Sequence, residues 1–430
     1  MKQLLFVFTF LISIVSASNE PPLNIILIMA DDLGYETLTA NGGESYQTPR
    51  LDQLAAKGAR FEHCYAQPVC TSSRVKIMTG LSNVRNYTWF GNLNHKQKTF
   101  AHYLKKAGYA TAIAGKWQLG GKLDYPKHFG FDEELLWQHK RSRFREGTRH
   151  DSRFENPVLE QNNTALEFNK GEYAPDLFTD YLCDFMTRKK DEPFFAYYPM
   201  VLAHCPFAPT PDSKDWDPES KGSLTYLGSP QYFGDMVSYM DKLVGRIVDH
   251  VESLGIADRT VILFTGDNGT DQPITSLFQG RAVQGGKLTT KDSGTRVPLI
   301  AYAPGLIKPM VVQDLVDLSD FLPTMCDIAG IKSPNNIDGQ SFWPQLRGET
   351  GSPREWVYCW YSRSGKTEDA QVFARTQKYK VYATGEFYDI PRDVDELNPL
   401  VNLTQEQIQI KEQLTDVIKS YAKYRPENQE

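Results

Sequence analysis

The fold class of this chain is decided by the stretch Asn24-Ile25-Ile26-Leu27-Ile28-Met29-Ala30-Asp31-Asp32. After Asn24 the run is apolar without alternation, which is typical of a parallel strand buried on both faces, and it ends abruptly in two aspartates. A second apolar run, residues 261–264, leads into Thr265-Gly266-Asp267-Asn268-Gly269, and residues 297–301 form a third. These runs predict buried strands within a sheet.

Helical patterns alternate with these strands. Thr48-Pro49 supplies an N-cap and an N1 proline for a helix that Gly58 ends, and residues 99–107 form a second helix before a strand over residues 109–114. Residues 194–202 predict another strand, and Ser229-Pro230 opens a long helix whose apolar stripe ends at Gly255. The alternation predicts an α/β fold with a large, mostly parallel central sheet flanked by helices.

The pattern changes beyond about residue 343. Aromatic-rich segments over residues 356–361, 371–375 and 379–383 alternate enough to form antiparallel strands, and residues 405–421 form a final helix. We therefore expect a large domain over residues 18–343 and a small C-terminal α+β subdomain, containing an antiparallel sheet, over residues 344–430.

The amino-acid composition and net charge limit the class of protein and the kinds of molecule that it can bind. The 430 residues contain 40% hydrophobic and 23% charged side chains, which is ordinary globular usage and excludes a disordered or fibrous chain. With 47 basic and 53 acidic side chains the net charge is −6, so the chain has no global attraction for nucleic acid or for an anionic membrane. An anionic substrate must therefore be bound by a local cluster of positive charge.

The first residues carry a targeting signal. Lys2, an apolar run over residues 4–15 and Val15-Ser16-Ala17 together resemble a secretory signal peptide over residues 1–17. No later stretch reaches the ~20 apolar residues that a transmembrane helix needs. We therefore expect an exported protein, periplasmic or secreted, without a stable membrane anchor.

Six cysteines, at positions 64, 70, 183, 205, 326 and 359, are too few for a disulfide framework in a chain of this length, and no CxxC pair indicates zinc. If one of them has a chemical role, at least one of the other five stays unpaired.

Acid and amide side chains follow two of the predicted strands. Ligands gather at the carboxyl ends of parallel strands, so Asp31, Asp32, Asp267 and Asn268 should be considered together. They offer oxygen donors only, which favours a hard cation such as Ca²⁺ or Mg²⁺. Taken singly, each pair is more commonly a turn or an N-cap.

A cysteine precedes a helix-compatible segment in Gln67-Pro68-Val69-Cys70-Thr71-Ser72-Ser73-Arg74. This order places Cys70 and Arg74 at a helix N-terminus, where backbone N–H groups and the helix dipole favour an anion. A lone cysteine is more often a small buried hydrophobe than a nucleophile.

At these residues the sequence resembles the formylglycine-dependent sulfatases of the alkaline phosphatase superfamily. Cys70-Thr71-Ser72-Ser73-Arg74 matches the family signature, with Ser72 where proline is usual. The other matches, in chain order, are Asp31-Asp32, Gly115-Lys116-Trp117, Ala203-His204-Cys205-Pro206, Asp267-Asn268-Gly269, Gly286-Lys287 nine residues before Arg296, and Glu386-Phe387-Tyr388-Asp389.

The resemblance implies that a maturation enzyme oxidises Cys70 to formylglycine, an aldehyde held as its hydrate, and that one hydrate hydroxyl attacks the sulfur of a sulfate ester on a sulfated carbohydrate or polysaccharide fragment. One Ca²⁺ would be held by Asp31, Asp32, Asp267 and Asn268, with an oxygen of modified Cys70 completing the set. Arg74, Lys116 and Lys287 would stabilise the developing negative charge. His204 is the candidate that protonates the leaving oxygen, because imidazole is the side chain nearest the required pKa.

One position departs from the family pattern. The family usually continues Gly-Lys-Trp-His-Leu-Gly, whereas this chain has Gln118 in place of the histidine. An amide can hydrogen-bond sulfate but cannot titrate, so we assign Gln118 to substrate binding.

Two questions stay open. The basic run Lys140-Arg141-Ser142-Arg143-Phe144-Arg145, followed by Arg149-His150, is either a solvated loop or a basic wall for a polyanionic sugar. Two alternative functions also remain, a phosphoester or phosphonate hydrolase of the same superfamily and a non-catalytic glycan-binding relative.

Overall fold

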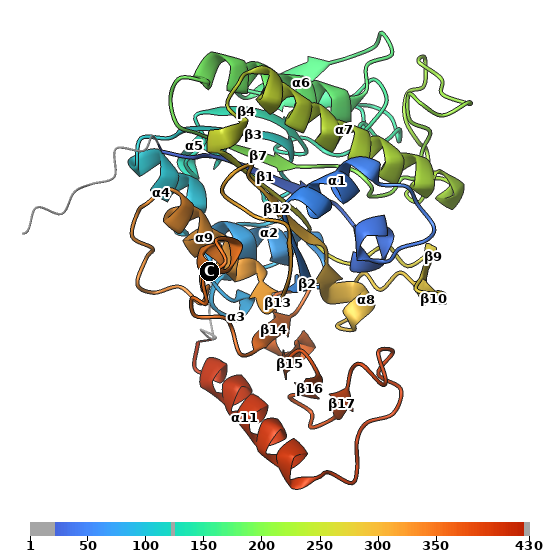
Figure 1. Ribbon diagram of the computed structural model, residues 1–430. Helices are drawn as coiled ribbons and strands as arrows, with labels where there is room; N and C mark the ends of the chain where they lie inside the picture. Colours follow the sequence, from blue (N-terminus) through green and yellow to red (C-terminus); the bar gives the residue numbers. More distant parts are fainter. Residues whose placement is uncertain (1–21, 122–124, 425–430) are drawn as a thin grey trace, which may run out of the picture.

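The computed structural model describes residues 22–121 and 125–424. The signal peptide predicted over residues 1–17 lies outside the described residues. The chain forms an α/β fold with one large sheet, helices on both of its faces and a smaller antiparallel sheet near the C-terminus (Figure 1).

The centre of the large sheet is parallel. Strand β1 (Asn24–Ala30) lies between β7 (Phe194–Pro199) and β8 (Thr260–Gly266), and it is parallel to both. Beyond β7, the parallel order continues through β3 (Ala110–Lys116) and β4 (Glu133–Trp137). The predicted apolar strands 24–30 and 261–264 are thus confirmed as neighbours with buried side chains on both faces.

The edges of the sheet are mixed. The third apolar run forms β11 (Arg296–Val297) and β12 (Leu299–Tyr302), and β12 is antiparallel to β8. The strand expected over residues 194–202 is shorter and ends at Pro199. The other strands of this sheet are β2 (Ala59–Tyr65), β5 (Val158–Gln161), β6 (Thr164–Glu167) and β13 (Met310–Asp317).

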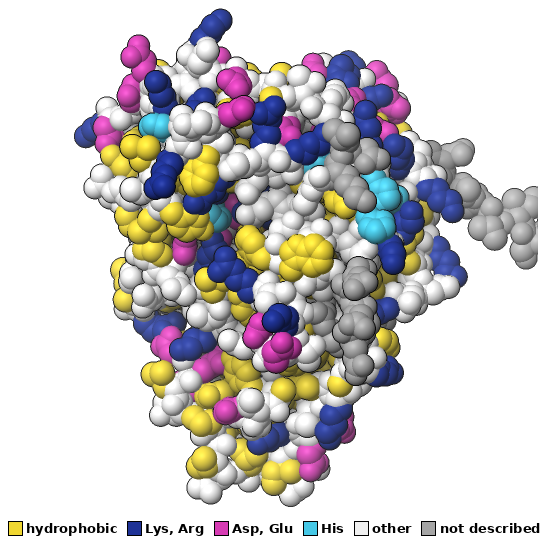
Figure 2. Space-filling model, turned by 180° about the vertical axis from the view of Figure 1, so that it is seen from behind, with side chains coloured by type: hydrophobic (Ala, Val, Ile, Leu, Met, Phe, Trp, Pro, Cys, Tyr) yellow, Lys and Arg dark blue, Asp and Glu magenta, His cyan; other side chains and the backbone are white. Residues whose placement is uncertain are grey.

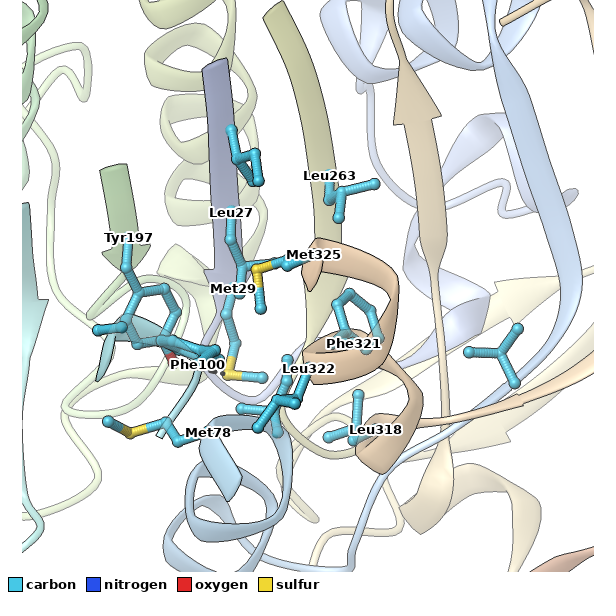
Figure 3. Packing of buried hydrophobic residues seen from close by; sticks show 14 of the residues in the cluster. Leu27, Met29, Met78, Phe100, Tyr197, Leu263, Leu318, Phe321, Leu322 and Met325 are labelled. Atoms are coloured by element: carbon cyan, nitrogen blue, oxygen red, sulfur yellow. Dashed lines mark hydrogen bonds between the residues drawn. The ribbon is translucent and has the colours of Figure 1, made fainter. Parts of the chain in front are cut away.

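Alternate residues of β1 face two separate hydrophobic cores. Ile26 and Ile28 pack with α1 (Pro49–Lys57), α6 (Ala174–Lys189) and α7 (Phe233–Ser253), which cover one face. Leu27 and Met29 face the other side, toward Phe321, Leu322 and Met325 (Figure 3). The helices on that side are α2 (Cys70–Thr79), α4 (Phe100–Lys106) and α9 (Phe321–Ile328).

The C-terminal segment forms its own four-stranded antiparallel sheet, which lies at one end of the molecule with α11 (Gln405–Ala422) beside it (Figure 1). Its strands are β14 (Val357–Tyr361), β15 (Gln371–Arg375), β16 (Tyr379–Tyr382) and β17 (Phe387–Asp389). The sheet contacts the large domain through buried Lys76, whose Nζ donates to Asp317 (2.6 Å) and to the Tyr358 carbonyl (3.3 Å). The domain boundary at residue 343 stays a prediction.

Short elements complete the described chain. They are α3 (Asn83–Asn86), α5 (Tyr125–His128), α8 (Asp292–Thr295), α10 (Trp343–Leu346) and the hairpin of β9 (Thr275–Phe278) with β10 (Arg281–Gln284). Across residues 22–121 and 125–424, no helix combines the length and the apolar character needed to cross a membrane. The six cysteines are free thiols. The face seen in Figure 2 mixes basic with acidic side chains, so no single charge dominates it.

Replacing Leu27 by alanine tests the central strand. Leu27 is fully buried in the middle strand of the sheet, so the Leu27→Ala variant should lose about 2–5 kcal/mol of unfolding free energy through lost burial and a cavity. Denaturant unfolding followed by circular dichroism measures this loss. The control Leu224→Ala, at a side chain that is 65% exposed, should change stability by less than about 0.5 kcal/mol. Equal effects of the two substitutions would contradict this account of the core.

Candidate active site

The acid and amide side chains predicted from the sequence lie together. Because Ala30 of β1 pairs in register with Gly266 of β8, the residues that follow these two strands emerge side by side. The backbone N–H of Asp32 donates to Asp267 Oδ1 (3.0 Å), and Asn268 Nδ2 donates to Asp32 Oδ1 (2.8 Å). Asp31 and these three residues are fully buried.

Cys70 is the first residue of α2 and faces this cluster. Its Sγ and carboxylate oxygens of Asp31 and Asp267 all lie within 4.8 Å of one another. Burial raises the pKa of the Cys70 thiol, so the unmodified side chain stays protonated at neutral pH. Its Sγ–H donates to Gln118 Oε1 (3.3 Å).

Three cations predicted from the sequence surround the same point. Arg74 lies one turn along α2 from Cys70 and donates to Asp267 Oδ2 through Nε (3.1 Å) and Nη2 (2.9 Å). Lys116, the last residue of β3, places Nζ 2.7 Å from Asp31 Oδ2. The Lys287 ammonium donates to the Asp32 carboxylate.

The pKa values of Asp267 and Asp31 are shifted in opposite directions. Burial raises the pKa of Asp267 to about 8, and the charge of Asp31 adds to this effect in spite of Arg74. Burial also disfavours the charged form of Asp31, but Lys116, His204 and Arg74 outweigh it and hold the pKa of Asp31 well below its usual range. Without a further positive charge, Asp267 therefore keeps its proton near neutral pH.

The donor set fits a hard divalent cation. Among the described residues, Asn268 Oδ1 is buried and accepts no hydrogen bond, so it is a ligand atom without a protein partner. Its neighbours Asp31, Asp32 and Asp267 supply carboxylate oxygens, the donors that Ca²⁺ and Mg²⁺ prefer. A cation here would replace the retained proton.

His204 lies on the other side of the cluster, between two cations. Its Nε2 is 3.1 Å from Lys287 Nζ, and the guanidinium of Arg153 contacts its Nδ1. Burial and these two cations hold the pKa of His204 well below its usual range. The imidazole is therefore neutral at pH 7, which makes it a weaker candidate for proton donation than its residue type alone suggests.

A cavity of about 420 Å³ opens onto these groups. From the predicted set it exposes Cys70, Gln118, His204 and Lys287. It also exposes residues that sequence analysis missed, namely Val69, Phe90, Gln138, Arg153, Tyr226, Asp271, Leu288 and Arg363.

Arg153 is the most consequential of the missed residues. It is 2% exposed, contacts His204 and the Cys205 carbonyl, and lies 4.2 Å from the ring centre of Trp137. No local motif marks it, because its position in the site depends on a long loop that returns to the sheet. Its proximity to the basic run was the only signal in the sequence.

One residue of the basic run over residues 140–145 lines the cavity, and others belong to a surface loop. Arg143 lines the cavity, as a basic wall would. Arg145 instead donates to the backbone carbonyls of Lys221 (3.0 Å) and Glu155 (3.2 Å), and Arg141 lies 3.9 Å from Glu146. Within the run, only Arg143 lines the cavity. Arg145 hydrogen-bonds the backbone of neighbouring segments, and Arg141 lies near Glu146 on the surface.

Several residues at the site have strained backbone conformations. Four non-glycine residues around it have positive φ angles: Asp32 (59°), Gln118 (46°), Gln138 (57°) and Leu288 (73°). Such conformations cost free energy and persist where the surrounding structure fixes a functional geometry. The Gln118 N–H donates to the Gln138 carbonyl (3.2 Å), which fixes the Gln118 backbone beside Cys70.

Comparisons with known proteins agree with this geometry. Residues 23–331 match the family model described as sulfatase, and residues 287–423 match the model described as N-sulphoglucosamine sulphohydrolase, C-terminal. Human arylsulfatase A is 33% identical over 84% of this chain and 75% of its own length, and mouse N-acetylgalactosamine-6-sulfatase is 31% identical over 81% and 71%.

The solved structure of BT4656, in complex with its substrate D-glucosamine-2-N,6-O-disulfate, superposes with a TM-score of 0.73 at 22% identity, over 95% of this chain and 99% of that one. This likeness shows that the fold is shared. The family match over residues 23–331 and the relatives above 30% identity establish that the chain belongs to the sulfatase family and is a sulfuric ester hydrolase.

Proposed function

We propose that this protein hydrolyses sulfate monoesters on a sulfated carbohydrate, using a nucleophile made from Cys70 by oxidation to formylglycine and one Ca²⁺ held by the acidic cluster. The observation that carries the proposal is the position of Cys70. It begins α2, its Sγ lies within 4.8 Å of two carboxylates, and it faces the cavity beside Lys287.

Modification explains why a buried, protonated thiol occupies this point. The raised pKa of Cys70 makes the thiol a poor nucleophile as it stands. Formylglycine, as its hydrate, would supply two hydroxyl groups. The oxygen of the first would bond to sulfur while the sulfur–oxygen bond to the alcohol breaks. The second would then lose its proton, which restores the aldehyde and releases sulfate.

The fixed cations suit an anionic substrate. Burial lowers the pKa of Lys287, but Asp32 and Asp271 outweigh it and raise that pKa well above its usual range, so Lys287 is charged where it meets the cavity. Lys116 and Arg74 lie deeper, against Asp31 and Asp267. In a water-poor site such positive charges stabilise negative charge that develops on transferring oxygens.

We assign the remaining polar groups at the cavity to the leaving group and the sulfate. His204 is proposed as the proton donor to the leaving oxygen. Burial lowers its pKa, Lys287 and Arg153 lower it further, and a bound sulfate ester would offset those two charges and raise the pKa. Gln118 is proposed to bind sulfate, since its side chain lines the cavity next to Cys70.

The calcium ligands in this proposal are Asp31, Asp32, Asp267 and Asn268, with an oxygen of modified residue 70. Bound there, the ion would act as a Lewis acid toward sulfate oxygens. The buried, unpartnered Asn268 Oδ1 supports this assignment.

A sulfated sugar is the substrate class that the cavity and the relatives support. One relative is named for a 6-sulfated N-acetylgalactosamine, and one structural neighbour was solved with a disulfated glucosamine. Export and the maturation enzyme that would oxidise Cys70 remain part of the proposal.

Mass spectrometry of the peptide containing Cys70 tests the nucleophile. Protein from a host with a maturation enzyme should carry formylglycine at position 70 and hydrolyse 4-nitrophenyl sulfate. The Cys70→Ala variant should lose at least about a thousandfold in kcat, because it lacks the reacting group. Cys359→Ala, at another buried cysteine, is the control. An unmodified thiol in fully active protein would refute the mechanism.

Calcium should stabilise the fold through the acidic cluster. At about 100 times its Kd, Ca²⁺ should raise the unfolding free energy by about 2.7 kcal/mol, measured as a rise in Tm over EDTA-treated protein. Because Asp267 must lose its proton to bind, and its pKa is about 8 without the ion, affinity should fall as the pH drops from 8 to 6. The Asp267→Asn variant should lose the calcium response, whereas the exposed control Asp258→Asn should keep it. A calcium response that survives in Asp267→Asn would place the ion elsewhere.

Matched aryl esters separate a sulfatase from a phosphoester hydrolase. The site should favour 4-nitrophenyl sulfate over 4-nitrophenyl phosphate by roughly a hundredfold or more in kcat/KM. The ratio is measured on one preparation of matured protein. A preference for the phosphate would select the alternative function, and hydrolysis of neither ester by formylglycine-bearing protein would favour a glycan-binding role.

A further inference from the structure

A second cavity adjoins the one above the acidic cluster. It has a volume of about 770 Å³ and adjoins the first cavity along Phe90, Leu288 and Arg363, which line both; the two cavities together are called the groove. Its other lining residues are Trp89, Tyr361, Ser364, Asp369 and Gln371. A substrate whose sulfate lies at Cys70 can therefore extend along this groove.

The most prominent residue of the second cavity is Trp89. Its side chain is 52% exposed, although a tryptophan normally gains from burial. The backbone around it is fixed, because Gly91 N–H donates to Thr71 Oγ1 (3.1 Å) in the first turn of α2, next to Cys70. The indole is therefore held open to solvent at a set position relative to the nucleophile.

The C-terminal subdomain builds the opposite wall of the groove. The Tyr87 hydroxyl donates to the Arg363 carbonyl (3.2 Å), and Gly365 packs so closely that a Cβ there would lie 1.4 Å from the Thr88 carbonyl oxygen. Gly365 also has a φ of +80°, which only glycine adopts readily. This turn after β14 thus fixes Arg363 against the segment that carries Trp89.

Arg363 has a free positive charge in this position. Its guanidinium lies 5.0 Å from the ring centre of Phe90, and within the described chain it pairs with no carboxylate. An exposed indole beside an unpaired guanidinium matches an acidic sugar, since the apolar face of a sugar ring stacks on an aromatic plane and arginine binds carboxylate or sulfate through two parallel hydrogen bonds.

We propose that this groove is a second sugar subsite, in which Trp89 stacks on the sugar next to the sulfated one and Arg363 binds an anionic group on that neighbour. The protein would therefore act on sulfated oligosaccharides in preference to free sulfated monosaccharides. This inference rests on the proposed function, because it takes the sulfate to lie at Cys70.

Competition with 4-nitrophenyl sulfate tests the subsite, because an inhibition constant reports binding whether or not the sugar is desulfated. The ligands are N-acetylgalactosamine 6-sulfate, a chondroitin 6-sulfate hexasaccharide, whose neighbouring sugar carries a carboxylate, and an iota-carrageenan hexasaccharide, whose neighbouring sugar carries a sulfate. At least one hexasaccharide should inhibit about tenfold more strongly than the monosaccharide, and the one that does identifies the anionic group.

Substitutions of Trp89 and Arg363 then test whether these two residues cause the stronger binding of the hexasaccharide. Trp89→Ala and Arg363→Ala should each raise the inhibition constant of that hexasaccharide about tenfold and lower the hexasaccharide-to-monosaccharide preference by the same factor. Trp89→Phe should restore most of the preference. Added salt should weaken the contribution of Arg363 and leave that of Trp89, since salt screens only the charged contact. Exposed residues elsewhere, in Leu397→Ala and Arg347→Ala, serve as controls.

Two results would overturn the proposal. One is equal inhibition by the monosaccharide and both hexasaccharides, and the other is a preference for hexasaccharide that survives both alanine substitutions. Either result can occur in protein that hydrolyses 4-nitrophenyl sulfate normally, so failure of the subsite is distinguishable from failure of the proposed sulfatase chemistry.

Discussion

The balance of buried charge where β1 and β8 end is the constraint on which the rest of this structure depends. Three carboxylates, those of Asp31, Asp32 and Asp267, are fully buried within a few ångströms of one another. Buried charge is tolerated only when it is paired. Arg74, Lys116 and Lys287 each pair with one of these carboxylates, and a hard cation would add to that compensation.

This constraint also bears on the form of the nucleophile that we propose at position 70. A helix begins at Cys70 and its backbone N–H groups favour an anion, whereas burial, together with the charges of Asp31 and Asp267, disfavours a thiolate. The proposed conversion of Cys70 into an oxygen nucleophile would need no thiolate, and its product would still lie at a helix N-terminus that favours a bound anion. Burial, together with the neighbouring cations Lys287 and Arg153, lowers the pKa of His204 and keeps it neutral.

The fold and the deepest part of the site could be predicted because they depend on local sequence. The strand interiors over residues 25–30 and 261–264 are buried on both faces and entirely apolar, and Asp31 and Asp267 emerge just beyond them. Ordered motifs then indicated Cys70 and the cations. The antiparallel pairing of β12 was not predictable, because a buried strand has the same composition in either direction.

The sequence by itself determined the fold class and the acid and amide residues that follow two strands, because both depend on runs of neighbouring residues. The other residues around Cys70 were indicated by the resemblance to a known family. Only the tertiary structure decided what surrounds them. Arg153, Trp89 and Arg363 come from loops that no periodicity describes. Arg153 lines the first cavity, Trp89 lines the second, and Arg363 lines both. The lining of the cavities therefore depends on long-range contacts, whereas the acid and amide groups at the strand ends follow directly from the local sequence.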